Sequence, residues 1–266
     1  MSFINQPTSP DNHFFIDTNV LLDIIYDQRQ RHKLAMDFYK RFKNLELSVV
    51  FEVFKEANKV VEDYCSGFAR DFSTFLISEE KHSTKWDDLS RGKKIKRLED
   101  FKNWVNSRYK DDAVYPFYNA ILTNVEVYLP DRSYSDIREF LLNLPSYFLL
   151  WLKVNIQTRF SIHIAISDIS NDNVRKFQDE LDKLMRSKYF DKTQKGDVRI
   201  IIELILLILY GSEVVREYKQ VTFYTLDNLL SSNFFKFKRE MPIMNDTEFN
   251  DLMKKGLERI TIEAPY

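Results

Sequence analysis

The sequence predicts an α/β protein, a three-layer α/β/α sandwich around a mostly parallel sheet, rich in helix and interrupted by an all-α insertion. Two patterns lead to this expectation. Towards both ends of the chain, short apolar runs of strand length alternate with longer segments whose apolar residues recur at helical spacing. Between them lies a long stretch in which almost every segment has the helical period.

The N-terminal elements follow the order strand, helix, helix, strand, helix. A short buried strand is expected over 13–17, and a helix over 19–27 follows it directly. The segment 29–44 also has helical spacing, and a second strand over 45–50 runs into a long amphipathic helix over 51–68. This alternation is typical of a parallel sheet whose faces are covered by helices.

The middle of the chain, residues 70–190, is expected to be a helical insertion. Its segments each carry an apolar stripe at helical spacing, and Pro130 and Pro145 punctuate them. We therefore assign residues 1–69 and 191–266 to one α/β domain, which the insertion over 70–190 divides.

The α/β alternation returns near the C-terminus. A strongly apolar helix is expected over 196–211, and a strand ending in an acidic residue over 221–227. Two more helices and a last strand are expected over 228–237, 247–257 and 259–263.

Composition excludes several classes of function. The net charge of −1 means that nucleic-acid binding would require a local basic patch. The five glycines do not form a Walker loop or a dinucleotide fingerprint. The single cysteine, Cys65, excludes an internal disulfide and favours a reducing, cytoplasmic compartment. The most apolar segments are shorter than a membrane span, so no membrane association is expected.

Acidic residues recur where the predicted strands end or the following helices begin. Asp17 ends the first strand and Asp227 ends the strand over 221–227. Glu56 lies in the first turns of the helix after the second strand, and Asp197 opens the apolar helix. Because the carboxyl ends of parallel strands and the starts of the following helices share one edge of a sheet, these side chains are expected to converge.

Converging carboxylates repel one another, and a bound divalent cation removes that cost. Oxygen ligands favour Mg²⁺ or Mn²⁺, whereas scattered histidines and one cysteine do not provide a zinc site. Such ions lower the pKa of bound water and stabilise the charge that develops on a scissile phosphate. The acidic pattern therefore predicts phosphodiester hydrolysis.

The same segments resemble the motifs of PIN-domain ribonucleases. FFIDTNVLLD resembles the opening motif, in which a strand, Asp, Thr and Asn precede an apolar helix. VFEVFKEANKVV is similar to the second motif, a helix with an inward Glu, and GDVRIIIELILL to the third, an Asp opening an apolar helix. VTFYTLDNLL resembles the fourth, a strand followed by Thr-x-Asp. The resemblance covers about residues 12–62 and 194–235, in the family's order.

The resemblance implies a metal-dependent endoribonuclease that hydrolyses RNA with metal-activated water. It implies that the catalytic and metal-binding residues are Asp17, Glu56, Asp197 and Asp227, with Asn19 and Thr225 in support. Glu52 shares a helix face with Glu56 and is the alternative second ligand. RNA is the expected substrate, a partner protein or antitoxin is compatible with the family, and the oligomeric state is open.

Other interpretations use the same residues. Asp17, Asp197 and Asp227 also stand where acidic residues cap helices, and Glu56 also suits a solvated helix face. The PIN-like fold could instead be a catalytically silent protein- or RNA-binding module that acts through its helical insertion. A phosphatase of the haloacid-dehalogenase type is disfavoured, because its second Asp is replaced by Asn19 here.

Further charged and aromatic residues lie outside the four motifs. Asp23 is expected at the surface, and Glu203, within the apolar helix, is expected to pair with an arginine. The basic run 90–97 is interpreted as a solvated helix face, with contact to an RNA backbone as the alternative. The aromatic residues of the insertion are expected to pack in its core rather than stack on bases.

Overall fold

The computed structural model describes residues 11–27, 29–42, 45–80, 84–110, 114–163, 172–191, 193–213, 217–241 and 246–266. The described chain divides into two compact units. The sheet unit takes its residues from 1–24, 34–57 and 156–266, and the helical unit takes its residues from 25–33 and 58–155.

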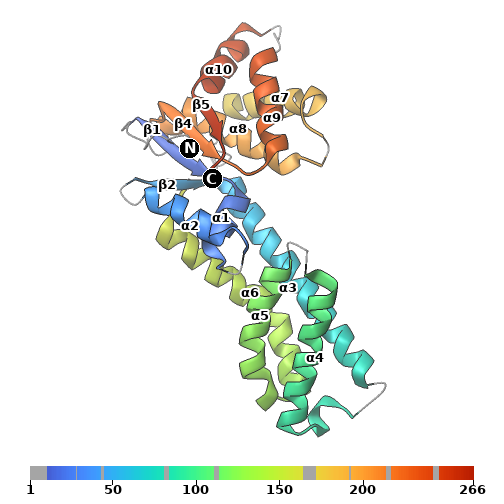
Figure 1. Cartoon of the computed structure of the whole chain (residues 1–266). Coiled ribbons are helices and arrows are strands. Elements are labelled where there is room, and N and C mark those ends of the chain that lie inside the picture. The colour runs from blue at the N-terminus through green and yellow to red at the C-terminus, as the bar shows by residue number, and fades with distance from the viewer. Residues whose placement is uncertain are drawn as a thin grey trace. The chain divides into compact units, whose positions relative to one another are not determined.

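The sheet is five-stranded and entirely parallel, with the order β3-β2-β1-β4-β5 (Figure 1). Its strands are β1 (Asn12–Ile16), β2 (Leu47–Val50), β3 (Ser161–His163), β4 (Gln220–Tyr224) and β5 (Ile260–Glu263). This confirms the predicted α/β class. The central β1 pairs with β2 on one side and with β4 on the other, so Asp17, the residue after β1, lies at the middle of the sheet's carboxyl edge.

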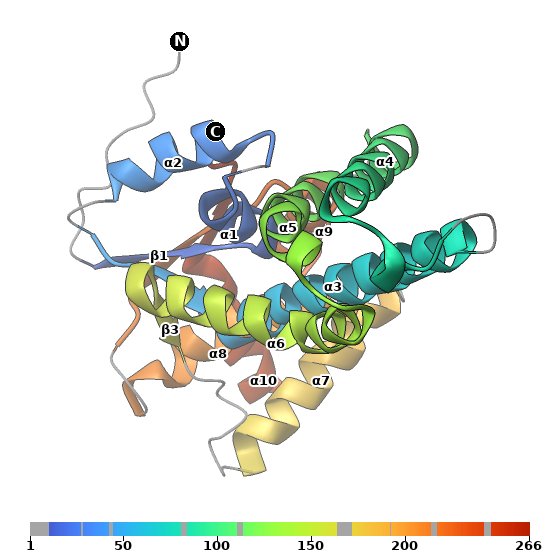
Figure 2. The ribbon, with the colours of Figure 1, turned by 90° about the horizontal axis from the view of Figure 1, so that it is seen from below.

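Helices cover both faces of the sheet. Phe38 of α2 (His32–Arg41) and the adjacent Phe42 pack against Tyr224, and Phe42 also packs against Phe14. Figure 2 shows α1 (Thr18–Ile25) and α2 on one side of the sheet and α8 (Lys195–Tyr210) on the other. α7 (Asp172–Lys188) and α10 (Thr247–Glu258) pack against α8, and α9 (Asn228–Glu240) connects β4 to α10.

The helix α8 is buried because almost all of its side chains from Val198 onward are apolar. Nine of its side chains, from Val198 to Ile208, are buried. The helix lies between the sheet and α10, where the Gly256 backbone approaches the Ile205 side chain closely. None of the described helices, α8 included, is long and apolar enough to cross a membrane.

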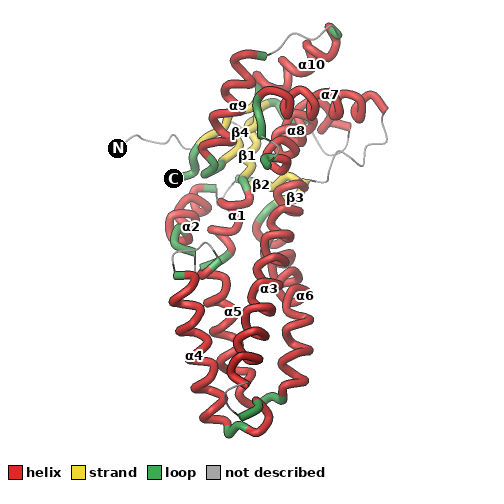
Figure 3. The backbone as a smooth tube through the Cα atoms, turned by 90° about the vertical axis from the view of Figure 1, so that its right-hand side faces the viewer, coloured by secondary structure: helices red, strands yellow, loops and turns green. Residues whose placement is uncertain are grey.

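The helical unit contains most of α3 (Phe51–Glu80) and α6 (Tyr134–Arg159), together with α4 (Arg91–Tyr109) and α5 (Tyr115–Tyr128). The short 3-10 turns η1 (Trp86–Asp88) and η2 (Leu129–Asp131) join them, and a further one, η4 (Gly211–Glu213), follows α8 in the sheet unit. Figure 3 shows α3, α4, α5 and α6 side by side. Their core is aromatic: Phe68 contacts Phe72, Phe101 and Tyr118.

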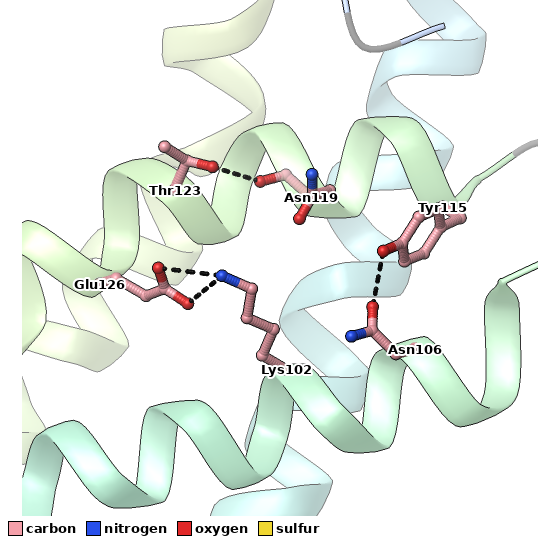
Figure 4. A network of polar contacts seen from close by, with 6 residues as sticks. All are labelled: Lys102, Asn106, Tyr115, Asn119, Thr123 and Glu126. Atoms are coloured by element: carbon pink, nitrogen blue, oxygen red, sulfur yellow. Dashed lines mark hydrogen bonds and ion pairs between the residues drawn. The ribbon is translucent and has the colours of Figure 1, made fainter. Parts of the chain in front are cut away.

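Polar contacts join α4 to α5 at the edge of this core. Lys102 Nζ lies 2.9 Å from Glu126 Oε1, and the Tyr115 hydroxyl donates to Asn106 Oδ1 at 2.6 Å (Figure 4). The basic run 90–97 is only partly a solvated face, because Lys94 and Arg97 are buried. Lys94 donates to the Arg132 carbonyl and Arg97 to the Thr84 carbonyl, so these two cations satisfy backbone groups inside the fold.

The expected domain boundaries, with an insertion over 70–190, differ from the units of the structure. The helical unit consists of Ile25–Lys33 and Asn58–Asn155, and the segment 156–190 belongs to the sheet unit. The insertion was expected to be helical throughout, but α6 ends at Arg159 and the strand β3 then pairs with β2. Pro145 does not separate two helices, because α6 continues through it. Burial of Leu144 and Leu152 on either side offsets the cost of a proline inside a helix.

Candidate metal centre

Asp17 occupies the single residue between β1 and α1, and its side chain is only 5% exposed. Its backbone N–H donates to the Tyr224 carbonyl at 2.9 Å, which continues the pairing of β1 with β4. Its Oδ1 accepts from the Thr18 backbone N–H at 2.7 Å, and its Oδ2 accepts from the Thr225 hydroxyl at 2.8 Å. The strand-to-helix corner therefore holds both carboxylate oxygens.

Glu56, rather than Glu52, faces this corner. Its Oε2 accepts from the Thr18 hydroxyl at 2.6 Å. A Cβ at Gly196 would lie 3.6 Å from its Oε1, so the Glu56 carboxylate lies against the start of α8. Glu52 instead forms an ion pair with Lys55 at 2.7 Å. Of these two residues, Glu56 is therefore the one whose carboxylate lies next to the Asp17 corner.

Asp197 lies in the first turn of α8, two residues after the helix begins, and is partly buried. Its Oδ2 accepts from Gln194 Nε2 at 3.1 Å. Gln194 Oε1 in turn accepts from Asn233 Nδ2 and from the Asp191 backbone N–H, both at 3.1 Å. Gln194 therefore holds Asp197 and links it to α9.

Asp227 does not end a strand, because β4 stops at Tyr224. It is the N-cap of α9. Its Oδ1 accepts from the Leu229 and Leu230 backbone N–H groups at 2.7 and 2.9 Å. Its own N–H donates to the Thr225 hydroxyl, the same hydroxyl that donates to Asp17. One Asp227 oxygen is thus committed to the helix, and Thr225 connects Asp227 with Asp17.

Asn19 lies in the first turn of α1 with an exposed side chain. In the described part of the chain, no hydrogen bond joins it to any of the four carboxylates. Thr18, its neighbour, makes the contact to Glu56 that the sequence did not assign to any residue.

The pKa values of Asp17 and Asp197 reflect the charges of the neighbouring carboxylates. The pKa of Asp17 is raised to about 7, chiefly by burial and also by the charges of Glu56 and Asp197, against hydrogen bonds from Thr225 and Thr18 that lower it. Burial raises the pKa of Asp197 to about 6, with the charges of Asp227 and Glu56 adding to the effect and the hydrogen bond from Gln194 opposing it. The four predicted carboxylates are therefore coupled to one another through Asp17 and Asp197.

The residues fit a hard divalent ion by the chemistry of their donor atoms. All four supply carboxylate oxygens, and the raised pKa values of Asp17 and Asp197 show that the negative charges of these two are costly without a cation. Within the described ranges, no three Asp, Glu, His or Cys side chains lie close enough together to hold one ion. Mg²⁺ commonly binds through one or two carboxylates and several waters, so a pair such as Asp17 and Glu56 supplies the number of carboxylates that such an ion uses.

Two nearby acids are placed differently from the sequence expectation. Asp23, expected at the surface, is 2% exposed and accepts from the Tyr266 hydroxyl at 2.9 Å. Glu203, expected to pair with an arginine, accepts from the Glu52 backbone N–H at 2.8 Å. Burial raises the pKa of Glu203 to about 7. Each of these carboxylates is satisfied by a partner that is remote in sequence.

Sequence reasoning missed three polar residues that support the carboxylates: Thr18, Gln194 and Asn233. Thr18 stands within the first motif, and its position next to Asp17 was a usable signal. Gln194 precedes the third motif, whereas Asn233 lies on a helix with no local sign of its contact. Comparison with protein-family models, with curated proteins and with solved structures finds no match to this chain.

Proposed function

We propose that this protein is a Mg²⁺- or Mn²⁺-dependent endoribonuclease of the PIN-like type. The observation that carries the proposal is the pair Asp17 and Glu56, which Thr18 joins at the carboxyl edge of a parallel sheet, with the charges of neighbouring carboxylates raising the pKa values of Asp17 and Asp197. The likeness of the four segments to PIN-domain motifs supports the same conclusion, as does their order along the chain.

The protein's own groups prepare the site in a defined way. Asp17 and Glu56 would hold the ion first, because Thr18 bonds to both carboxylates and fixes their relative positions. Asp197 is held by Gln194, and the second oxygen of Asp227 is left for the site because Oδ1 caps α9. The bound ion would lower the pKa of a coordinated water and offset the charge at the scissile phosphate.

The test is cleavage of a fluorescently labelled single-stranded RNA by the full chain in Mg²⁺ or Mn²⁺. Asp17→Asn and Asp197→Asn should each slow cleavage by more than about 100-fold, the upper end of what loss of a group supporting a metal ligand costs. The matched control is Asp37→Asn, because Asp37 is an exposed aspartate of α2 that forms an ion pair with Lys40. Wild-type rates in Asp17→Asn, or a wild type that does not cleave RNA with either ion, would refute the proposal.

A second candidate, a binding module without catalysis, is favoured by a different observation. Tyr147, Leu150, Trp151 and Val154 of α6 are all more than 40% exposed, which is unusual for apolar side chains so close along one helix. A module of this kind does not need the carboxylates to bind a metal. Mn²⁺ calorimetry that detects no binding would favour it over the nuclease.

A further inference from the structure

A separate pocket lies within the helical unit, between α3 and α6. Its volume is about 380 Å³, within the range of small-ligand sites. Leu76, Ile137 and Leu141 form a buried apolar floor, with exposed fractions of at most 8%. Leu142 also lines the pocket and is 74% exposed, so apolar surface extends from the buried floor to the solvent. The pocket therefore offers apolar surface to a ligand that enters from solvent.

The charges at this pocket have one sign. Arg70 on α3 and Arg138 on α6 line it, together with Ala69, Ser73 and Tyr134, and no acidic residue is among the lining residues. Arg70 has one long ion pair, 3.7 Å from Asp71, and its side chain is 76% exposed.

Asp71 does not neutralise the pocket, because its carboxylate faces the helical core. Its Oδ2 accepts from the Tyr109 hydroxyl at 2.6 Å and from the Tyr118 hydroxyl at 3.2 Å. Within the described residues, no ion pair engages Arg138. Two guanidinium groups therefore stand beside an apolar floor, with little competition from the protein's own carboxylates.

We propose that this pocket binds a single-chain amphiphile with an anionic head, of which a medium-chain carboxylate is the simplest form. The apolar chain covers Leu76, Ile137 and Leu141, and the carboxylate accepts charge-assisted hydrogen bonds from Arg70 and Arg138. Guanidinium groups suit this role because their donors match the two oxygens of a carboxylate. The proposal does not depend on nuclease activity, since the pocket and the carboxylate site lie in different units.

The first experiment titrates decanoate into the full chain with methyl-labelled leucine and isoleucine, observed by NMR. The expected result is a saturable shift at the methyl groups of Leu76, Ile137, Leu141 and Leu142, with a Kd of about 1 mM or tighter. Decylamine and decanol are the matched probes, with the same chain and a cationic or neutral head. Equal binding of either one, shifts spread over other surface methyls, or no saturable shift with decanoate would overturn the proposal.

The second experiment tests the arginines by substitution. Arg138→Gln and Arg70→Gln change exposed side chains and should each weaken decanoate binding by about three- to tenfold. Lys153→Gln removes an exposed cation from the same α6 outside the pocket and should leave the affinity unchanged. Leu142→Glu places a negative charge at the rim and should abolish binding. An affinity insensitive to both arginine variants would contradict the assignment.

Discussion

Replacing Asp17 by asparagine should stabilise the metal-free protein above neutral pH. In the folded chain the pKa of Asp17 is about 7, against a reference value of 3.8. As pH rises between these two values, the unfolded chain loses the proton that the folded chain keeps, so the free energy of unfolding falls. Above the folded pKa the full cost of the buried charge remains. Asparagine carries no charge and escapes this cost.

The magnitude follows from the pKa difference and the lost hydrogen bond. At about 1.4 kcal/mol for each pKa unit, the buried charge costs about 4 kcal/mol above pH 7. The substituted asparagine keeps an acceptor for the Thr18 N–H but cannot also accept from the Thr225 hydroxyl, which costs about 1–2 kcal/mol. The variant should therefore be about 2–3 kcal/mol more stable than wild type near pH 8, and slightly less stable near pH 4.

The assay must report on the sheet unit. All three tryptophans, Trp86, Trp104 and Trp151, belong to the helical unit, so tryptophan fluorescence follows that unit and serves as an internal control. Amide hydrogen exchange at β1 and β4, with a chelator present, measures the opening free energy of the sheet unit across the pH range. A variant that is less stable than wild type at every pH would refute the view that Asp17 is a costly buried charge.

Two further substitutions test packing and burial elsewhere in the sheet unit. Glu203→Gln keeps an acceptor for the Glu52 N–H. Because the pKa of Glu203 is raised to about 7, the neutral glutamine should raise the free energy of unfolding by about 1–3 kcal/mol above pH 7. Near pH 4, where the carboxyl is protonated in the folded chain, the substitution should change nothing. Equal gains at both pH values, measured by urea unfolding, would exclude the charge as the cause. Gly256→Ala places a Cβ 2.7 Å from Ile205 Cγ2 and should cost about 1–2 kcal/mol, the overpacking penalty less the gain in helix propensity. The control is Gly92→Ala, which should not destabilise the protein because nothing lies within 4 Å of the added Cβ. Equal losses of stability in Gly256→Ala and Gly92→Ala would show that the contact with Ile205 is not the cause.

The sequence predicted those parts of the fold whose evidence lies in adjacent residues. The run Phe14–Ile16 is apolar and buried, and Thr18 starts a helix directly after Asp17, so both the strand and the corner could be read from adjacent residues. β3 could not, because its short segment continues the apolar pattern of α6. The boundary at Asn58 was equally hidden, since α3 runs through it and the only glycine of that helix, Gly67, lies nine residues further along.

The errors in the acidic residues have one physical cause. Asp23 and Glu203 are satisfied by the Tyr266 hydroxyl and by the Glu52 N–H, which are 243 and 151 positions away along the chain. No local pattern identifies such partners. An aspartate within a predicted helix, such as Asp23, is therefore expected to face solvent. The link from Asp197 through Gln194 to Asn233 escaped detection for the same reason.

The most direct test of the metal site is a calorimetric titration of Mn²⁺ into wild type and into matched glutamine and asparagine variants. Wild type should bind, and Asp17→Asn and Glu56→Gln should lose that binding. Glu52→Gln should keep it, because Glu52 is paired with Lys55, whereas Glu56 is the carboxylate that accepts from the Thr18 hydroxyl. Binding that survives in both Asp17→Asn and Glu56→Gln, or that is lost in Glu52→Gln alone, would contradict the account.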